Sequence, residues 1–290
     1  SGFSDAWAAS CGEVTPFERA VLHSGERAGT LGEVFDQLAG YLDDQHELRE
    51  SVTTAMLYPM FVLGLAVVVA IAMFGFILPN LQRLFTESAM QLPWLTRMIM
   101  ASSQWGLRVF LPVGIAAGAC AWFAIGSIRR NPAQRERMEQ MLFGWPLVGR
   151  GYKLLVNVRF AQTMSLLLRG GVGIVEAMEL AGMATGSVWL GRLLKHEAGA
   201  VRDGAPLAKV LRNVPPLGGA LPGWVHAGEA SGHLQPLLSR AGERFQHQWR
   251  LYIKRVTAVL EPVLILIVAV IVLIVALAVL MPILQMNKAM

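Results

Sequence analysis

The feature that most constrains this chain is a set of three long, predominantly apolar stretches, in which Glu261 is the sole charged residue. They lie at residues 55–79, 109–128 and 259–285. Each has about the 20 residues that an α-helix, rising about 1.5 Å per residue, needs to cross a bilayer core. We therefore predict three transmembrane helices at these positions. The alternative is that each stretch is a buried helix of a large soluble protein.

The composition agrees with a membrane protein. Of the 290 residues, 54% are hydrophobic and only 16% are charged, against about 25% charged in a typical soluble domain. This excludes intrinsic disorder, which requires low hydrophobicity and high charge, and argues against a purely soluble enzyme. The two cysteines, Cys11 and Cys120, show no spacing typical of a disulfide framework or a metal site.

Charge is distributed unevenly and predicts the topology. Residues 1–54 contain three basic and ten acidic residues, whereas residues 129–258 contain 18 basic and eight acidic residues. Because basic residues flanking membrane spans stay in the cytoplasm, we place 129–258 there. Three spans then put 1–54 in the cytoplasm, and a short loop (80–108) and the tail (286–290) on the opposite side. Basicity could also indicate nucleic-acid binding, but beside membrane spans the topological interpretation is simpler, and we expect no nucleic-acid partner.

The segments outside the spans have helical patterns and no alternation long enough for a sheet. Expected helices, several ended by glycine, lie at 160–169, 174–184, 188–201, 206–211 and 218–230, with a sixth beginning near Leu234 and continuing into the third span. The predicted fold class is all-α: two cytoplasmic helical bundles and three transmembrane helices.

The chain contains an internal repeat. Shifted by 203 positions, residues 22–82 align with 225–285 without a gap and with 19 identities in 61 positions. The matched residues include two prolines 20 positions apart in each copy. The repeat predicts a duplicated unit, a helical bundle leading into a span of one orientation. The first copy lacks a counterpart of residues 160–203, so we expect its bundle to be incomplete and the chain to be truncated at its amino end.

These residues resemble a known family, the inner-membrane platform proteins of type II secretion and type IV pilus assembly (the GspF/PilC family). The pattern Gly-Glu-x-x-Gly-x-Leu occurs twice, beginning at Gly25 and at Gly228. Prolines open the first and third spans, Trp145-Pro-Leu-Val-Gly149 precedes the second bundle, and the end at 282–287 resembles the secretion branch. The resemblance covers nearly the whole chain.

The resemblance implies a function and partners. It implies a multi-pass protein of the bacterial inner membrane that couples a hexameric cytoplasmic secretion ATPase to pseudopilus assembly. The partners would be that ATPase, other inner-membrane platform proteins, pilin-like pseudopilin subunits, lipid and further copies of the chain. Alternatives are the same role in type IV pilus assembly and, in another class, a small membrane transporter with an internal repeat.

Motifs of enzymes and cofactor sites are missing from the sequence, including the phosphate loop, the nucleophile elbow and the zinc-binding helix. We therefore assign no catalytic, cofactor-binding or metal-binding residue. The acidic stretch 43–50 could hold a metal, although a solvated or partner-facing side is the simpler interpretation. The candidate contact or structural residues are Gly25, Glu26, Gly29, Gly228, Glu229, Gly232, Glu261, Pro59 and Pro262.

Two interpretations stay open for the carboxylates among them. Glu26 and Glu229 either contact a partner or form a charged network between the bundles, or else each lies beside a glycine that ends a helix and accepts hydrogen bonds from first-turn amides of the next helix. Glu261 either receives the positive amino terminus of a pilin-like subunit, since intramembrane charges are usually functional, or reaches the lipid headgroups or Lys254. Pro59 and Pro262 are expected to be kinks or helix ends.

Overall fold

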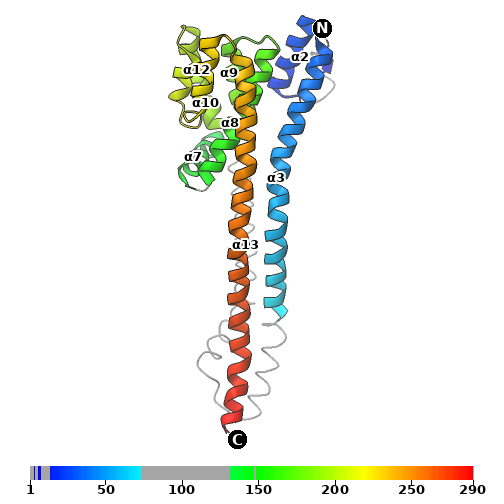
Figure 1. The fold of residues 1–290 in the computed structure, drawn as a ribbon, viewed down its shortest axis with the longest axis vertical. Coiled ribbons are helices and arrows are strands. Elements are labelled where there is room, and N and C mark those ends of the chain that lie inside the picture. The colour runs from blue at the N-terminus through cyan, green and yellow to red at the C-terminus, as the bar shows by residue number, and fades with distance from the viewer. Residues whose placement is uncertain (1–2, 4–5, 8–13, 73–130, 147, 290) are drawn as a thin grey trace. The chain divides into compact units, whose positions relative to one another are not determined.

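The computed structural model describes residues 3, 6–7, 14–72, 131–146 and 148–289 (Figure 1). The described part is helical and contains no strand, which confirms the all-α prediction. Its main helices are α2 (Pro16–Ala28), α3 (Leu31–Ala72), α7 (Pro132–Gly144), α8 (Val148–Arg169), α9 (Ile174–Ala184), α10 (Val188–Arg202), α11 (Leu207–Arg212), α12 (Leu221–Ser231) and α13 (Leu234–Ala289).

The chain divides into two compact units. The bundle unit comprises residues 1–52 and 128–253, and the apolar unit comprises 53–127 and 254–290. Helices α3 and α13 contribute to both, since each continues through the boundary without a break. The two segments expected to form separate bundles, 1–54 and 129–258, thus contribute most of their residues, 1–52 and 129–253, to one compact unit.

The bundle unit has one hydrophobic core that joins the two copies of the repeat. Phe17, Leu22 and Leu38 of the first copy are buried in the same cluster as Phe160 and Leu238. Helix α8 lies at the centre, because most of its residues from Val156 to Leu167 are buried. Burial on almost all faces explains why α8 shows little amphipathic pattern.

Local sequence explains where several helices begin. Thr15 and Glu18 form a capping box at the start of α2, with Pro16 in the first turn. Asn131 caps α7 and Ser187 caps α10, each through its side-chain oxygen. Most predicted helices are confirmed: α9 has the predicted bounds, and α10, α11 and α12 begin or end within three residues of them.

Some predictions need correction. Helix α7 and the first turns of α8, up to residue 159, were not expected. Pro59 and Pro262 lie inside α3 and α13, so neither ends a helix. Helix α13 continues to Ala289 and does not end at 285.

Two described helices are long and apolar enough to cross a membrane, within Leu31–Val69 and Leu234–Leu273. They contain much of the first and third predicted spans. The second predicted span (109–128) and the loop at 80–108 lie outside the described residues. Pro79, which with Pro59 forms the proline pair of the first repeat copy, lies outside them as well.

Candidate functional site

The Gly-Glu-x-x-Gly-x-Leu motif forms the same helix corner twice. Helices α2 and α12 end at Gly29 and Gly232, whose φ angles of 71° and 73° lie in the left-handed region that favours glycine. The long helices α3 and α13 begin two residues later, at Leu31 and Leu234. The repeat seen in the sequence is therefore also a repeat of backbone conformation.

The first glycine of each motif allows the two helices of the corner to touch. A Cβ atom on Gly25 would lie 2.5 Å from Val34 Cγ2, and one on Gly228 would lie 2.8 Å from the Cα atom of Leu234. Both separations are shorter than a van der Waals contact. Any larger residue at Gly25 or Gly228 would therefore push α3 or α13 away from the helix before it.

The glutamate of each motif accepts a backbone hydrogen bond. Glu229 receives the amides of Leu207 at 2.5 Å and Ala208 at 3.1 Å, and so caps α11. Glu26 receives the amide of Phe3 at 2.5 Å. This is capping of the kind that one interpretation expected, but the capped helix precedes α12 in the chain and does not follow it.

The acidic stretch of α3 bonds to residues of α8 and α13 within the bundle unit. Asp44 accepts hydrogen bonds from the side-chain amides of Gln162 and Gln246, both at 3.1 Å. Glu47 accepts from Gln246 at 3.3 Å and from Arg250 at 3.0 Å. These contacts occupy two of the four carboxylates proposed for metal binding. Among the described residues, no group of three potential metal ligands is found.

A polar cavity of about 260 Å³ adjoins this network. Tyr41, Asp44, Gln162, Ser165 and Gln235 are among its lining residues. Tyr41 also accepts a hydrogen bond from Thr163 at 3.0 Å. Neutral amides and hydroxyls dominate the lining, and no nucleophile and base are paired there in the arrangement that covalent catalysis requires.

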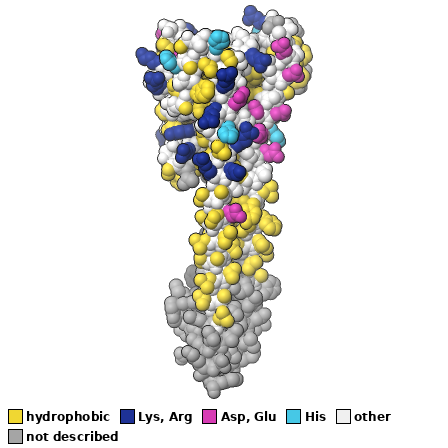
Figure 2. Space-filling view, viewed as in Figure 1, with side chains coloured by type: hydrophobic (Ala, Val, Ile, Leu, Met, Phe, Trp, Pro, Cys, Tyr) yellow, Lys and Arg dark blue, Asp and Glu magenta, His cyan; other side chains and the backbone are white. Residues whose placement is uncertain are grey.

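Charge is segregated over the bundle unit. Figure 2 shows Lys and Arg side chains gathered on one side of it and Asp and Glu on the other. The acidic side belongs to α3, where Asp36, Asp43 and Glu50 are exposed, and α10 and α11 carry exposed Lys195, Arg202, Lys209 and Arg212. The opposite charges predicted for the two copies therefore occupy different surfaces.

Sequence reasoning missed a buried carboxylate that joins α7 to α10. Glu139 is 6% exposed and accepts hydrogen bonds from the hydroxyl of Ser187 at 2.8 Å and the amide of Trp189 at 3.0 Å. Arg135 pairs with it at 3.3 Å. Tyr152 donates to Ser187 at 2.7 Å, and burial, above all, raises the pKa of Tyr152 to about 12. No local pattern marks Glu139, because its partners lie some 50 residues later.

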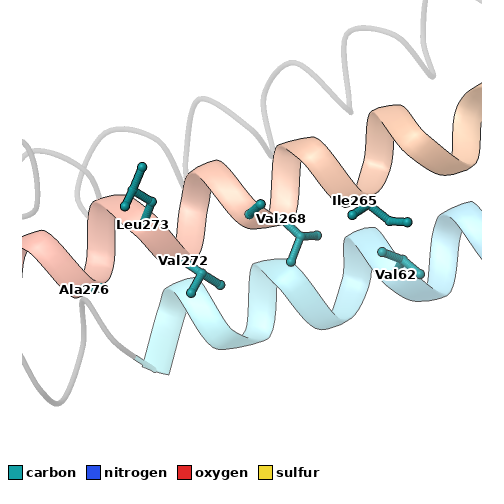
Figure 3. A pocket seen from close by; sticks show the side chains of 7 residues that line it. Val62, Ile265, Val268, Val272, Leu273 and Ala276 are labelled. Atoms are coloured by element: carbon teal, nitrogen blue, oxygen red, sulfur yellow. The ribbon is translucent and has the colours of Figure 1, made fainter.

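The apolar unit carries a shallow groove between α3 and α13, with a volume of about 580 Å³. Figure 3 shows its lining side chains, which belong to Val62, Ile265, Val268, Ala269, Val272, Leu273 and Ala276. Glu261 is exposed on α13 one turn before Ile265. Residues four apart share a helix face, so a carboxylate lies on the groove's side of α13.

Comparison with known proteins identifies the family. The family described as "Type II secretion system (T2SS), protein F" matches residues 1–79 and 160–282. The chain is 30% identical to type II secretion system protein F of Pseudomonas aeruginosa over 93% of its own length and 66% of that protein's. It is 27% identical to type II secretion system protein F of Aeromonas hydrophila, over 93% and 69% of the two lengths.

A relative from the pilus branch is also similar. Type IV pilus assembly protein PilC of Thermus thermophilus is 28% identical over 85% of the chain and 61% of that protein. The chain thus spans about two thirds of the length of the curated relatives it matches. The family match covers most of the sequence, and the described helices are those of an all-α membrane protein. The chain belongs to the type II secretion system protein F family.

Proposed function

We propose that this chain is an inner-membrane platform protein of a type II secretion system, which couples a cytoplasmic secretion ATPase to pseudopilus assembly. The observation that carries the proposal is its membership of the protein F family, together with the duplicated corner from which two long helices continue into apolar sequence. Its role is structural and mechanical and not catalytic. Further copies of the chain and other inner-membrane platform proteins complete the assembly.

The proposed topology places residues 1–54 and 129–258 in the cytoplasm, and 80–108 and 286–290 in the periplasm. Two features support it. The described parts of residues 1–52 and 128–253 share one hydrophobic core, which supports placing them on the same side of the membrane. The basic residues just before the third apolar stretch, Arg250, Lys254 and Arg255, favour the cytoplasm for that side.

The glycines and glutamates of the two motifs fix the corners. Gly25 and Gly228 permit close helix packing, Gly29 and Gly232 end the helices, and Glu26 and Glu229 hold the preceding segments. Pro59 and Pro262 are kink positions within the spans. On this proposal none of the eight residues contacts a partner directly.

Glu261 and the groove form the proposed acceptor for a pilin-like subunit. The carboxylate would pair with the subunit's positive amino terminus while an apolar helix of the subunit lies along the groove. We expect Glu261→Gln to abolish secretion. The matched control is Glu243→Gln, an exposed carboxylate on the same helix within the bundle unit. Intact secretion with Glu261→Gln would remove this role for Glu261 and leave the platform role in place.

The platform role is tested by photo-crosslinking in cells from Asp43 and Arg192, exposed positions on α3 and α10. We expect capture of the secretion ATPase or of a pseudopilin from at least one position. Each adduct should disappear in a strain lacking that partner's gene. Capture of neither protein from either position would contradict the proposal.

A second candidate is the corresponding role in type IV pilus assembly, favoured by the 28% identity to the Thermus thermophilus protein. The two candidates differ in the phenotype that they predict. Deleting the gene should stop protein export if the secretion role holds. It should stop pilus formation and leave export intact if the pilus role holds.

A further inference from the structure

Four large apolar side chains are exposed at the corner between α7 and α8. Met138 and Met141 lie three residues apart on one side of α7, Trp145 follows the end of that helix, and Val148 begins α8. Met141 is 71% exposed and Trp145 is 61% exposed. Exposed apolar residues that cluster in this way mark an interaction surface.

The charges flanking these apolar side chains are positive. Arg137, Arg150 and Lys153 are exposed, and the Lys153 ammonium lies 4.3 Å from the centroid of the Phe143 ring, a contact that leaves its charge in place. Both carboxylates of α7 are occupied elsewhere, because Glu139 is buried against the start of α10 and Glu136 pairs with Arg192. The corner therefore presents aromatic and sulfur-containing side chains beside unneutralised cations, the combination that favours binding to an anionic membrane surface.

The corner is tethered close to membrane-spanning sequence on two sides. A Cβ atom on Gly151, in the first turn of α8, would lie 2.7 Å from the ring of Tyr252. Tyr252 is in the last turn that α13 contributes to the bundle unit, and seven residues later the apolar stretch at 259–285 begins. Towards the amino end, α7 begins four residues after the apolar stretch at 109–128. Four fully extended residues span at most about 14 Å, so the start of α7 lies within that distance of the end of the stretch.

We propose that the α7–α8 corner is an interfacial anchor that lies on anionic lipid headgroups. Its members are Met138, Met141, Trp145 and Val148, which enter the headgroup region, and Arg137, Arg150 and Lys153, which pair with lipid phosphates. The positive charge of the corner complements anionic headgroups, and its short links to the predicted spans keep it near the bilayer. Both observations favour the lipid surface over a protein partner. The anchor holds the bundle unit against the membrane independently of which branch of the family the chain serves.

The test uses the full chain in lipid vesicles, with the background substitutions Cys11→Ser and Cys120→Ser. A spin label is attached through Met141→Cys or, in a second variant, through Val148→Cys. Collisions with oxygen report contact with lipid, and collisions with a water-soluble nickel chelate report contact with water. The control label replaces His196, whose side chain is 85% exposed on α10. Vesicles contain phosphatidylcholine with or without phosphatidylglycerol.

We expect labels at 141 and 148 to collide more with oxygen and less with nickel than the label at 196, most of all with phosphatidylglycerol. Each basic residue near an anionic surface contributes about a fivefold change in binding. The triple variant Arg137→Gln/Arg150→Gln/Lys153→Gln should therefore lower the ratio of chains with a membrane-bound corner to chains with an unbound corner about a hundredfold. The matched control removes three exposed cations elsewhere, as Arg202→Gln/Lys209→Gln/Arg212→Gln, and should leave the ratio unchanged.

Three results would overturn the proposal. Nickel access at 141 and 148 equal to that at 196 would place the corner in water. Protection from both reagents would mean that protein covers it, from a second copy or another partner. If the collisions with oxygen changed neither on adding phosphatidylglycerol nor in the triple variant, recognition of anionic headgroups would be ruled out.

Discussion

Arg250 donates a hydrogen bond to Glu47 at 3.0 Å, and the two residues are 203 positions apart, which is the offset of the internal repeat. Equivalent positions of the two copies thus face each other across α3 and α13 in the bundle unit. The opposite net charges of the two copies meet directly at this point. The polar contacts of Gln246 with Asp44 and Glu47 extend the same interface by one turn.

Reversing one charge of this pair should weaken the interface, and exchanging both should restore it. Glu47→Arg or Arg250→Glu should each cost up to about 1 kcal/mol, because both side chains are about half exposed. The double variant Glu47→Arg/Arg250→Glu should recover most of that loss. Hydrogen exchange of α3 and α13 amides in the full chain measures the local opening free energy. Glu50→Arg is the control, and combining it with Arg250→Glu should show no coupling.

Removing the Glu229 carboxylate should loosen α11. Glu229→Ala leaves the amides of Leu207 and Ala208 without their acceptor, at a cost of about 1–2 kcal/mol. Glu229→Gln retains an acceptor oxygen and should cost less. Faster hydrogen exchange in α11, with exchange in α9 unchanged, is the expected signature. Equal exchange in α11 of both variants and of the parent chain would contradict the capping role.

Adding a methyl group to the close-packed glycines should disrupt the corners. Gly228→Ala places a Cβ atom against the backbone of Leu234, and Gly25→Ala places one against the stiff β-branched side chain of Val34. Each should destabilise its corner by about 1–3 kcal/mol. The control is Gly199→Ala within α10, where the added Cβ meets open space, and it should stabilise that helix by up to about 1 kcal/mol. Thermal unfolding of the full chain in one detergent compares the three variants.

The Tyr152 phenol should make stability fall at alkaline pH. Its pKa is about 12 in the folded protein and about 10 in the unfolded chain. The folded state therefore holds this proton more tightly, so the contribution of Tyr152 is complete below pH 10 and is lost as the pH rises from about 10 to 12. Denaturant midpoints at pH 9 and pH 11 should differ less in Tyr152→Phe than in the parent chain. The same difference in both would contradict the raised pKa.

Proline at position 173 should stabilise the turn before α9. Gly173 has a φ angle of −60° and a ψ angle of 147°, which proline adopts without strain, and a Cβ atom there meets nothing within 4 Å. Among the described backbone hydrogen bonds, none is donated by the Gly173 amide. Gly173→Pro should add about 0.4–1 kcal/mol through a less flexible unfolded chain. A lower melting temperature for the variant would contradict this expectation.

The internal repeat and the glycines that end helices made much of the fold predictable. Gly29, Gly171, Gly204 and Gly232 follow helices and have positive φ angles, so the ends of α2, α8, α10 and α12 could be recognised from sequence. The start of α13 near Leu234 was predictable for the same reason. These features depend on local conformation, which a few neighbouring residues determine.

Helix α7 and the first turns of α8 could not be recognised, because tertiary contacts stabilise them. Gly149 and Gly151 resemble turn residues in the sequence. In the structure they give room for the backbone of Phe143 and the ring of Tyr252. Glu139 caps α10 from a distance of some 50 residues along the chain. The sequence shows these residue types but not the partners that determine their roles.

The candidate site was predictable in part. The motif glutamates were singled out, and helix capping was among their interpretations, but the helix capped by Glu229 lies 21 residues before it. Opposite charges on the two copies were visible in the sequence, whereas the direct contact between positions 47 and 250 was not. Contacts between the two copies depend on how their helices pack together, which the local sequence does not specify.

Contact between repeat-equivalent positions has an evolutionary consequence. If two identical, separate chains met through the same position, each would contribute the same side chain to the contact. A charged residue there would then lie opposite a residue of the same charge. Fusion into one polypeptide removes that restriction, since each copy can then mutate alone. A glutamate opposite an arginine is therefore an asymmetry that a covalent tandem can acquire and a self-associating ancestor could not.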